Sequence, residues 1–262
     1  MNAHRGFLAC LPFLLAVPVL AQPQIGGGIC SSSTLSGTYS ATLTGRDLSS
    51  AVSFSNTTEG IGSVTFDGLS TVTFTLTTNT NKGFGMAQTL AGTYSLQSNC
   101  VGVLTITSGD AATFTLESYN SGKDYLITGQ DGVYALTGSG SALPATCPTS
   151  LTAGSYPFNG SGLGLSSASI SSVFNVIGII QLSGTNSIAI NSYVASNGGS
   201  TKNVSATGTY NLGSNCSATA MVTDTSGISY SLVFQFTSAS GNNFIFSSAS
   251  VQGMYTASGR SL

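Results

Sequence analysis

Histidine, tryptophan and charged side chains are almost absent from this sequence. His4 is the only histidine, tryptophan does not occur, and Asp, Glu, Lys and Arg together make up 5% of the 262 residues. Catalytic arrangements that pair a Ser or Cys nucleophile with a His base need a histidine beside the nucleophile. If the N-terminal segment that contains His4 is removed on export, this chemistry is excluded. A serine–lysine pair would then have to use one of three scattered lysines.

The charged residues show no pattern of a catalytic, metal or nucleic-acid site. Without Arg5, five basic residues remain against eight acidic ones, a net charge of −3, so no basic patch is available for nucleic acid. Most carboxylates lie in or beside predicted turns, and Asp224 is the only one in the second half of the chain. Neither a duplicated carboxylate pair nor a calcium loop is present. We therefore expect a protein that is not an enzyme and binds no cofactor, metal ion or nucleic acid.

The first 21 residues have the layout of a secretory signal peptide. His4 and Arg5 form a short basic head, residues 6–20 form an apolar run, and Val19-Leu20-Ala21 offers small residues for cleavage. The sequence therefore predicts an exported chain that is secreted, periplasmic or held at the cell surface.

Two other interpretations of this segment are weaker. A membrane anchor needs about 20 apolar residues, and here Pro12 and Pro18 interrupt a shorter run. A lipoprotein site at Cys10 would require the apolar run before the cysteine, whereas most of it follows.

A stretch that ends in cysteine occurs twice. Gly92–Cys100, GTYSLQSNC, returns 116 residues later as Gly208–Cys216, GTYNLGSNC. Upstream, Cys30 and Cys147 stand 117 residues apart, before Gly-Thr-Tyr and Gly-Ser-Tyr. We interpret the chain as a tandem duplication in which each copy has one early and one late cysteine.

The duplication also selects a cysteine pairing. An oxidising compartment favours disulfides, and the four cysteines that follow the signal peptide allow three pairings. If each copy folds as a unit, Cys30 pairs with Cys100 and Cys147 pairs with Cys216. A metal site is the alternative, and the long spacings without histidine disfavour it.

Apolar and polar residues alternate with a period of two. Thr71–Thr77 places Val72, Phe74 and Leu76 on one face and threonines on the other, as in a half-buried strand, and no segment keeps a helical period. Gly-containing turn signals separate the runs. The predicted strands are residues 36–44, 61–67, 70–78, 88–97, 101–107, 112–119, 124–128 and 133–138, then 153–159, 174–182, 186–195, 205–212, 217–223, 228–237, 242–247 and 250–257.

Eight strands in each copy fit either a closed antiparallel up-and-down barrel or a two-sheet β-sandwich. Sequential hairpins favour the barrel. The long connections at 45–60 and 160–173 would each cover one mouth as a flap. The predicted division of this all-β chain is a signal peptide at 1–21, an unstructured lead-in at 22–29, a first barrel at 30–142, a linker at 143–146 and a second barrel at 147–262.

The start of each copy resembles a known family. Gly37-Thr38-Tyr39 and Gly154-Ser155-Tyr156 resemble the Gly-x-Trp opening of calycin barrels such as lipocalins, with Tyr in place of Trp. The Gly-Thr-Tyr…Asn-Cys arrangement is similar to a group of exported bacterial repeat proteins. The resemblance rests on short motifs in both copies. It implies a calycin-like or allene-oxide-cyclase-like barrel and a small apolar ligand, with Arg260 as the only candidate for the basic residue of a last strand.

Two functions remain open at this level. One is a binding module that holds a small apolar molecule in a barrel lumen, and the other is a structural or adhesive protein of the cell surface. Lumen size separates them. A membrane-spanning barrel is disfavoured because turns mark both ends and no Trp girdle exists. The oligomeric state is left open.

For ligand binding we expect the second barrel, because residues 174–194 supply four isoleucines where the first copy has Phe66 and Phe74, and smaller aliphatic walls leave more room. The predicted ligand-binding residues are Tyr156, Ile177, Ile179, Ile188, Ile190 and Tyr210. Alternate strand positions predict further inward side chains at Tyr39, Phe66, Phe74, Tyr94, Phe114 and Leu116, and at Tyr230, Leu232 and Phe244.

Overall fold

The computed structural model describes residues 29–47, 56–109, 111–167, 169–183, 185–196, 201–250 and 252–261. The predicted signal peptide, residues 22–28 of the lead-in and residues 48–55 of the predicted flap at 45–60 lie outside the described residues.

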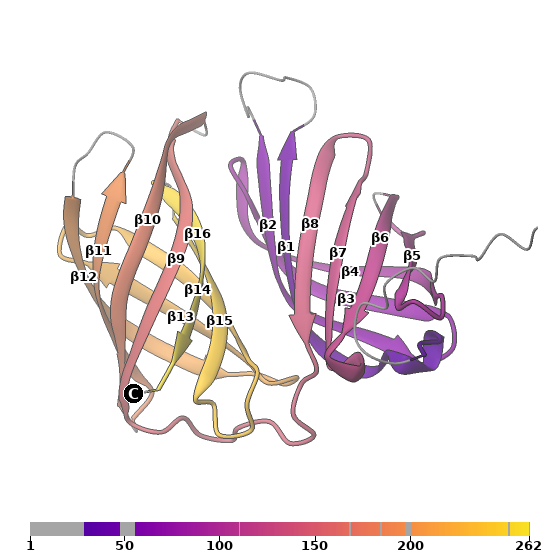
Figure 1. Ribbon diagram of the computed structural model, residues 1–262. Helices are drawn as coiled ribbons and strands as arrows, with labels where there is room; N and C mark the ends of the chain where they lie inside the picture. The colour runs from indigo at the N-terminus through magenta and orange to yellow at the C-terminus, as the bar shows by residue number, and fades with distance from the viewer. Residues whose placement is uncertain are drawn as a thin grey trace, which may run out of the picture.

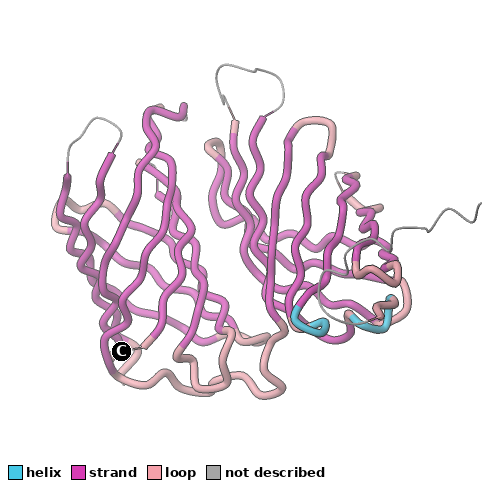
Figure 2. Tube along the Cα trace, in the orientation of Figure 1, coloured by secondary structure: helices cyan, strands magenta, loops and turns pink. Residues whose placement is uncertain are grey.

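Sixteen strands and two short 3-10 segments make up the described chain (Figures 1 and 2). The first half contains η1 (Ser32–Thr34), β1 (Ser36–Asp47), β2 (Thr57–Asp67), β3 (Thr71–Thr80), β4 (Gly83–Leu96), β5 (Val101–Ile106), β6 (Ala112–Tyr119), η2 (Asn120–Gly122), β7 (Asp124–Gln130) and β8 (Tyr134–Ser141). The second half contains β9 (Gly154–Ser166), β10 (Ser169–Leu182), β11 (Ser187–Ser196), β12 (Thr201–Leu212), β13 (Ser217–Asp224), β14 (Ser229–Phe236), β15 (Asn243–Ser250) and β16 (Gly253–Arg260). Each of the sixteen predicted strands corresponds to one of these.

The strands close into two antiparallel barrels, which lie side by side in Figure 1. In each barrel every strand pairs with its neighbours in sequence, and the first strand pairs with the last, β1 with β8 and β9 with β16. The up-and-down barrel prediction is confirmed and the sandwich alternative is wrong. Closure leaves no unpaired strand edge, which an eight-stranded sheet of this twist achieves while keeping an interior that side chains can fill.

Alternating burial follows the alternating sequence. In β3 the side chains of Val72, Phe74 and Leu76 are buried, whereas the threonines at 71, 73 and 75 are exposed. All the predicted inward aromatic and leucine residues lie in the two cores, with Tyr230 only partly buried. The β-branched and aromatic side chains thus supply both the strand propensity and the apolar area that stabilises each barrel.

The prediction of a flap at 160–173 is wrong, because this segment belongs to a long hairpin formed by β9 and β10. Its glycines serve close strand packing. A Cβ atom added to Gly162 would lie 2.2 Å from the Met254 carbonyl oxygen and 2.4 Å from the Tyr255 Cβ atom. The Gly/Ser composition that suggested a flexible loop is instead a requirement of the β9–β16 ladder. The 45–60 connection is also shorter than predicted, since β1 extends to Asp47 and β2 begins at Thr57.

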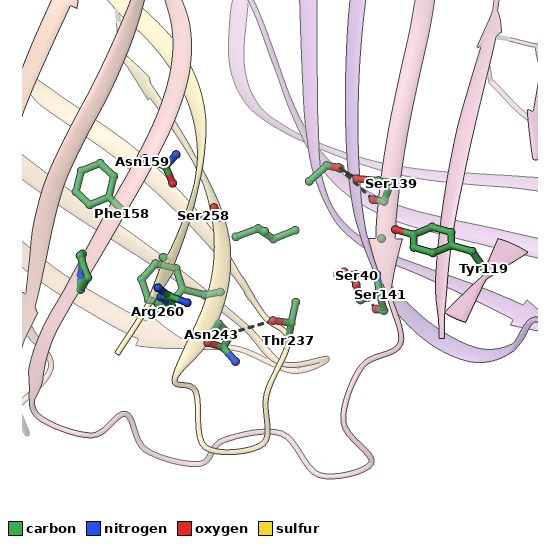
Figure 3. A pocket seen from close by; sticks show the side chains of 16 residues that line it. Ser40, Tyr119, Ser139, Ser141, Phe158, Asn159, Thr237, Asn243, Ser258 and Arg260 are labelled. Atoms are coloured by element: carbon green, nitrogen blue, oxygen red, sulfur yellow. Dashed lines mark hydrogen bonds between the residues drawn. The ribbon is translucent and has the colours of Figure 1, made fainter. Parts of the chain in front are cut away.

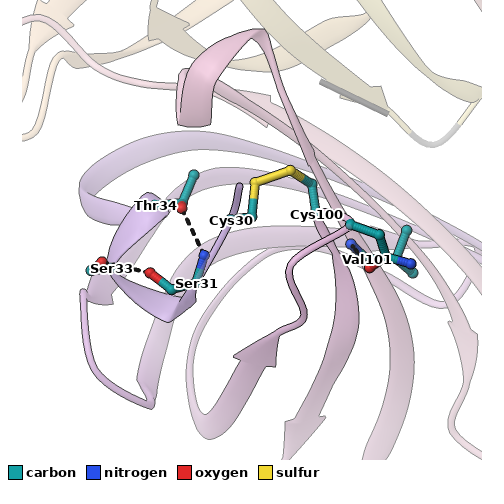
Figure 4. The surroundings of a disulfide bond; sticks show 7 residues. Cys30, Ser31, Ser33, Thr34, Cys100 and Val101 are labelled. Carbon is teal, nitrogen blue, oxygen red and sulfur yellow. Dashed lines mark hydrogen bonds between the residues drawn. A yellow bond between two sulfur atoms is a disulfide. The ribbon is translucent and has the colours of Figure 1, made fainter. Parts of the chain in front are cut away.

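One disulfide fastens each barrel, and both predicted pairings are confirmed. Cys30 bonds to Cys100 with a Cα–Cα distance of 5.0 Å (Figure 4), and Cys147 bonds to Cys216 with a distance of 4.6 Å. Each bond ties the segment before the first strand to the turn between the fourth and fifth strands. Such bonds are compatible with an extracellular or periplasmic location.

The two barrels contact each other through the outer faces of their strands. Ile61 of β2 is fully buried, although its neighbours Gly60 and Gly62 face the lumen side of the strand. The Asn79 side chain donates a buried hydrogen bond of 2.8 Å to the Ser247 hydroxyl of β15. Phe84 of the first barrel packs on an apolar cluster of Leu165, Ala249 and Met254. These contacts hold the barrels together beyond the short linker.

Candidate functional site

A cavity of about 260 Å³ lies inside the second barrel. It occupies the end where β9 and β15 finish and β10, β12 and β16 begin, opposite the disulfide. The residues that line it come from all eight strands of this barrel and from the β15–β16 turn; they are Gly164, Ser172, Phe174, Val176, Ile190, Ser192, Val194, Lys202, Val204, Ala206, Val222, Tyr230, Ser248, Ser250, Gln252, Gly253 and Tyr255.

The cavity has two chemically different walls. Strands β10 to β13 supply most of the apolar side chains, with Phe174, Val194 and Val222 among them. Strands β14 to β16 supply hydroxyl groups from Tyr230, Ser248, Ser250 and Tyr255. A mainly apolar cavity with a few polar groups on one side is the usual composition of a small-molecule site.

Comparable ladder positions in the two barrels explain where the space comes from. Tyr94 pairs with Leu104 in the first barrel, and Tyr210 pairs with Ala220 in the second. Starting from these tyrosines, the strand pairs can be followed around both barrels, so each inward position of one barrel has a counterpart in the other.

The second barrel has smaller side chains at several of these counterparts. Leu90 pairs with Phe74 in the first barrel, whereas Ala206 pairs with Ile190 in the second. One step along the ladder, Leu76 corresponds to Ser192, and Ile106 corresponds to Val222. Because the side chains of the second barrel are smaller at these positions while the strand pairing is the same, space is left in its lumen.

Hydroxyl groups replace apolar or absent side chains on the opposite wall. By the same ladder comparison, Tyr230 stands where the first barrel has Ala112, Ser248 where it has Gly129, and Tyr255 where it has Leu136. The second lumen therefore differs from the first in both volume and polarity.

The Asp224 carboxylate lies beside the cavity, where it is hydrogen-bonded to the cavity residue Tyr230. Burial by itself would raise the pKa of Asp224, but the Ile228 and Ser226 N–H groups, the Tyr230 hydroxyl and the Lys202 charge together lower it. The Tyr230 hydroxyl donates to Asp224 Oδ2 at 3.0 Å. Burial, and then the Asp224 hydrogen bond and charge, raise the pKa of Tyr230, so this phenol stays protonated.

Tyr255 and Lys202 complete the polar features of the cavity. Burial raises the pKa of Tyr255 to about 12, against the opposing effect of a hydrogen bond with Ser248. Lys202 is exposed and has no hydrogen bond or ion pair within the described chain. Since the Tyr230 proton is used in the bond to Asp224, the site offers the Tyr255 phenol as a donor, the Tyr230 oxygen as an acceptor and a cation at its rim.

Of the predicted ligand-binding residues, only Ile190 lines the cavity. Ile188 is buried deeper in the barrel. The Tyr156 and Tyr210 hydroxyls lie at the closed end and donate to the Thr152 and Ser183 carbonyls at 2.7 and 3.2 Å, so they are not available to a ligand in the cavity.

The prediction that Ile177 and Ile179 bind a ligand in the lumen is wrong. Their side chains are 59% and 41% exposed on the outside of the barrel, whereas Val176 and Ile180 point inward. Gly178 fixes this register, because a Cβ atom there would lie 2.7 Å from the Phe158 ring. The four aliphatic residues around Gly178 include two of each parity, so alternation alone cannot choose between the faces.

Several residues that line the cavity were not predicted from the sequence. Lys202, Ala206 and Tyr255 lie in the inward register, and the spacing of Lys202, Val204, Ala206 and Gly208 before Tyr210 is the signal that would have placed the first two. No group of three His, Cys, Asp or Glu side chains suited to a metal ion occurs among the residues that the structure describes. No helix in this described part is long and apolar enough to cross a membrane.

The geometry defines a disulfide-bonded double β-barrel with a two-sided cavity in one lumen. Comparison of the chain with protein-family models gives no match, and comparison with curated proteins gives none either. The calycin-like assignment therefore stays a prediction from short motifs.

Proposed function

We propose that this protein is an exported, non-catalytic binding protein whose second barrel holds one small, mainly apolar molecule. The observation that carries the proposal is the cavity of about 260 Å³. Its ligand would place an apolar face against Val194 and Val222 and a hydrogen-bonding edge against Tyr255 and Tyr230. The first barrel, filled by Leu76 and Leu90 at the corresponding level, would serve as a scaffold.

Export rests on the predicted signal peptide and agrees with the disulfide in each barrel. A tandem duplication followed by divergence would account for one filled and one open lumen. The absence of histidine after the signal peptide supports binding without catalysis.

Titration with the apolar fluorophore N-phenyl-1-naphthylamine tests the proposal. The wild-type chain should bind it saturably. The double variant Ser192→Leu, Ala206→Leu should not, because it gives the second lumen the two leucines that the first barrel carries at 76 and 90. These substitutions fill existing space, so circular dichroism should show an unchanged fold.

Ile179→Trp provides the matched control. It adds a large side chain to the same barrel, but on the outer face, and should leave fluorophore binding unchanged. Failure of the wild-type chain to bind would favour the alternative, a structural or adhesive protein of the cell surface.

A further inference from the structure

A long polar groove separates the outer faces of the two barrels. Two adjoining hollows of about 660 and 440 Å³ form it, and they share Thr42, Asn159, Ile245 and Ser258. One wall comes from β1, β8 and the end of β6, and the other from β9, β10, β15 and β16. Figure 3 shows this arrangement, with Ser139 and Tyr119 facing Asn159 and Ser258 across the gap.

Hydroxyl and amide side chains line most of the groove, beside a smaller number of apolar residues that include Ile245, which both hollows share. Serine, threonine and asparagine side chains dominate, Arg260 is the only charged residue, and neither Asp nor Glu lines either hollow. Phe158 is also labelled in Figure 3, but its ring belongs to the core of the second barrel. The lining is therefore unlike the lumen cavity, where apolar side chains predominate.

Many of these polar groups have no partner. On the first barrel, the Ser40 hydroxyl donates to the Ser141 carbonyl, and the Thr42 hydroxyl is hydrogen-bonded to the Ser139 hydroxyl. Across the groove, the side chains of Asn159, Ser258 and Arg260 make no hydrogen bond or ion pair within the described residues. The same holds for Tyr119, Thr44, Ser161, Asn175 and Thr256. Hydrogen-bond donors and acceptors without a partner in the described part of the chain therefore lie along both walls of the groove.

The walls are rigid because paired strands carry most of these side chains. The buried Asn79–Ser247 hydrogen bond and the packing of Phe84 on the apolar cluster of the second barrel hold the two walls in place. Closing the groove would bury unpaired polar groups, which is costly, whereas a ligand with many hydroxyls would pair with them.

We propose that this inter-barrel groove binds a neutral oligosaccharide chain. A sugar hydroxyl both donates and accepts hydrogen bonds, as Ser, Thr and Asn side chains do, and Arg260 adds further donors. Two adjoining hollows suit more than one sugar unit. Glycoside hydrolysis commonly needs a carboxylate pair, which the groove lacks, so its role is binding rather than cleavage.

Isothermal titration of the full chain with maltohexaose, cellohexaose and chitohexaose tests the proposal. At least one should bind saturably. Asn159→Ala and Arg260→Ala should each weaken that binding by up to about tenfold, as expected for removing one or two hydrogen bonds. Both residues are exposed, so the unfolding midpoint should not change. The matched control is Asn211→Ala on the outer face of β12, which should bind like the wild type.

Absence of saturable binding to all three saccharides, or binding that survives both groove substitutions, would overturn the proposal. This result is independent of the lumen site. Asn159→Ala should still bind N-phenyl-1-naphthylamine, and the Ser192→Leu, Ala206→Leu variant should still bind the saccharide.

Discussion

Glu59 should make the stability of this protein fall as pH rises toward neutrality. Its side chain is only 2% exposed, on the outer face of β2 where the second barrel covers it. The Oε2 atom has no hydrogen-bond partner in the described structure. Burial raises the pKa of Glu59 to about 7, against the opposing attraction of Arg46. The strands β14 and β15 that pack on β2 carry no charged residue to offset a carboxylate there.

The magnitude follows from the pKa difference. Between the ordinary value of 4.5 and about 7, the unfolded chain has lost this proton and the folded chain retains it. The free energy of unfolding therefore decreases as pH rises through this window, by about 3 kcal/mol in total. Glu59→Gln removes the titration, so the variant should gain about this much relative to the wild type between pH 4 and pH 8.

Urea unfolding at a series of pH values measures this difference. Tyrosine fluorescence or far-ultraviolet circular dichroism is the suitable signal because the chain has no tryptophan. Glu117→Gln, a carboxylate change on β6, is the control and should not reproduce the pH-dependent gain. If Glu59→Gln and the wild type differed by the same amount at pH 4 and pH 8, the buried-carboxylate argument would be refuted.

Three further predictions concern the barrels themselves. Replacing Cys147 and Cys216 with Ala should lower the free energy of unfolding of the second barrel by about 4 kcal/mol, because the bond closes a loop across a sequence separation of 69; equal urea curves for the variant and the oxidised wild type would contradict this. Tyr39→Phe should cost about 1 kcal/mol, since the buried hydroxyl donates to the Gly122 carbonyl at 2.6 Å, and urea unfolding would show whether that hydrogen bond contributes. The Thr71 hydroxyl, together with backbone N–H groups, lowers the pKa of Asp67 to about 2. Carbon-detected NMR of the Asp67 carboxyl should find this pKa in the wild type and a value closer to 3.8 in Thr71→Val. The stabilisation that ionised Asp67 gives the folded state should be lost as pH falls from about 4 to 2.

Local pattern was sufficient to predict the strands. In β3 and β6, apolar residues at every second position face the lumen, and Gly-containing turns end the runs. Since strand periodicity is a property of a few consecutive residues, it is readable without knowing the partners of the strand. The matching of Gly92–Cys100 with Gly208–Cys216 likewise predicted both disulfides, because equivalent segments should close equivalent loops.

Where apolar residues occupy both odd and even positions of a strand, the sequence pattern does not show which side chains face the lumen. In such strands the packing against neighbouring strands decides the orientation. In β10 the contact between Gly178 and the Phe158 ring turns Ile177 and Ile179 outward, and that contact joins two different strands. The cavity has the same origin. Tyr255 of β16 comes to face Ser192 and Ala206 only when the barrel closes, because it lies far from the β11–β12 hairpin in the sequence.

The sequence by itself determined the sixteen strands and the two disulfides, because each depends on residue identity or short-range order. Tertiary structure alone decided that Glu59 and Ile61, on the outer face of a barrel, are buried, and that the groove with Asn159 and Arg260 stays open. The physical reason is that burial and cavities arise from packing between distant surfaces, and no local pattern records which surfaces will meet.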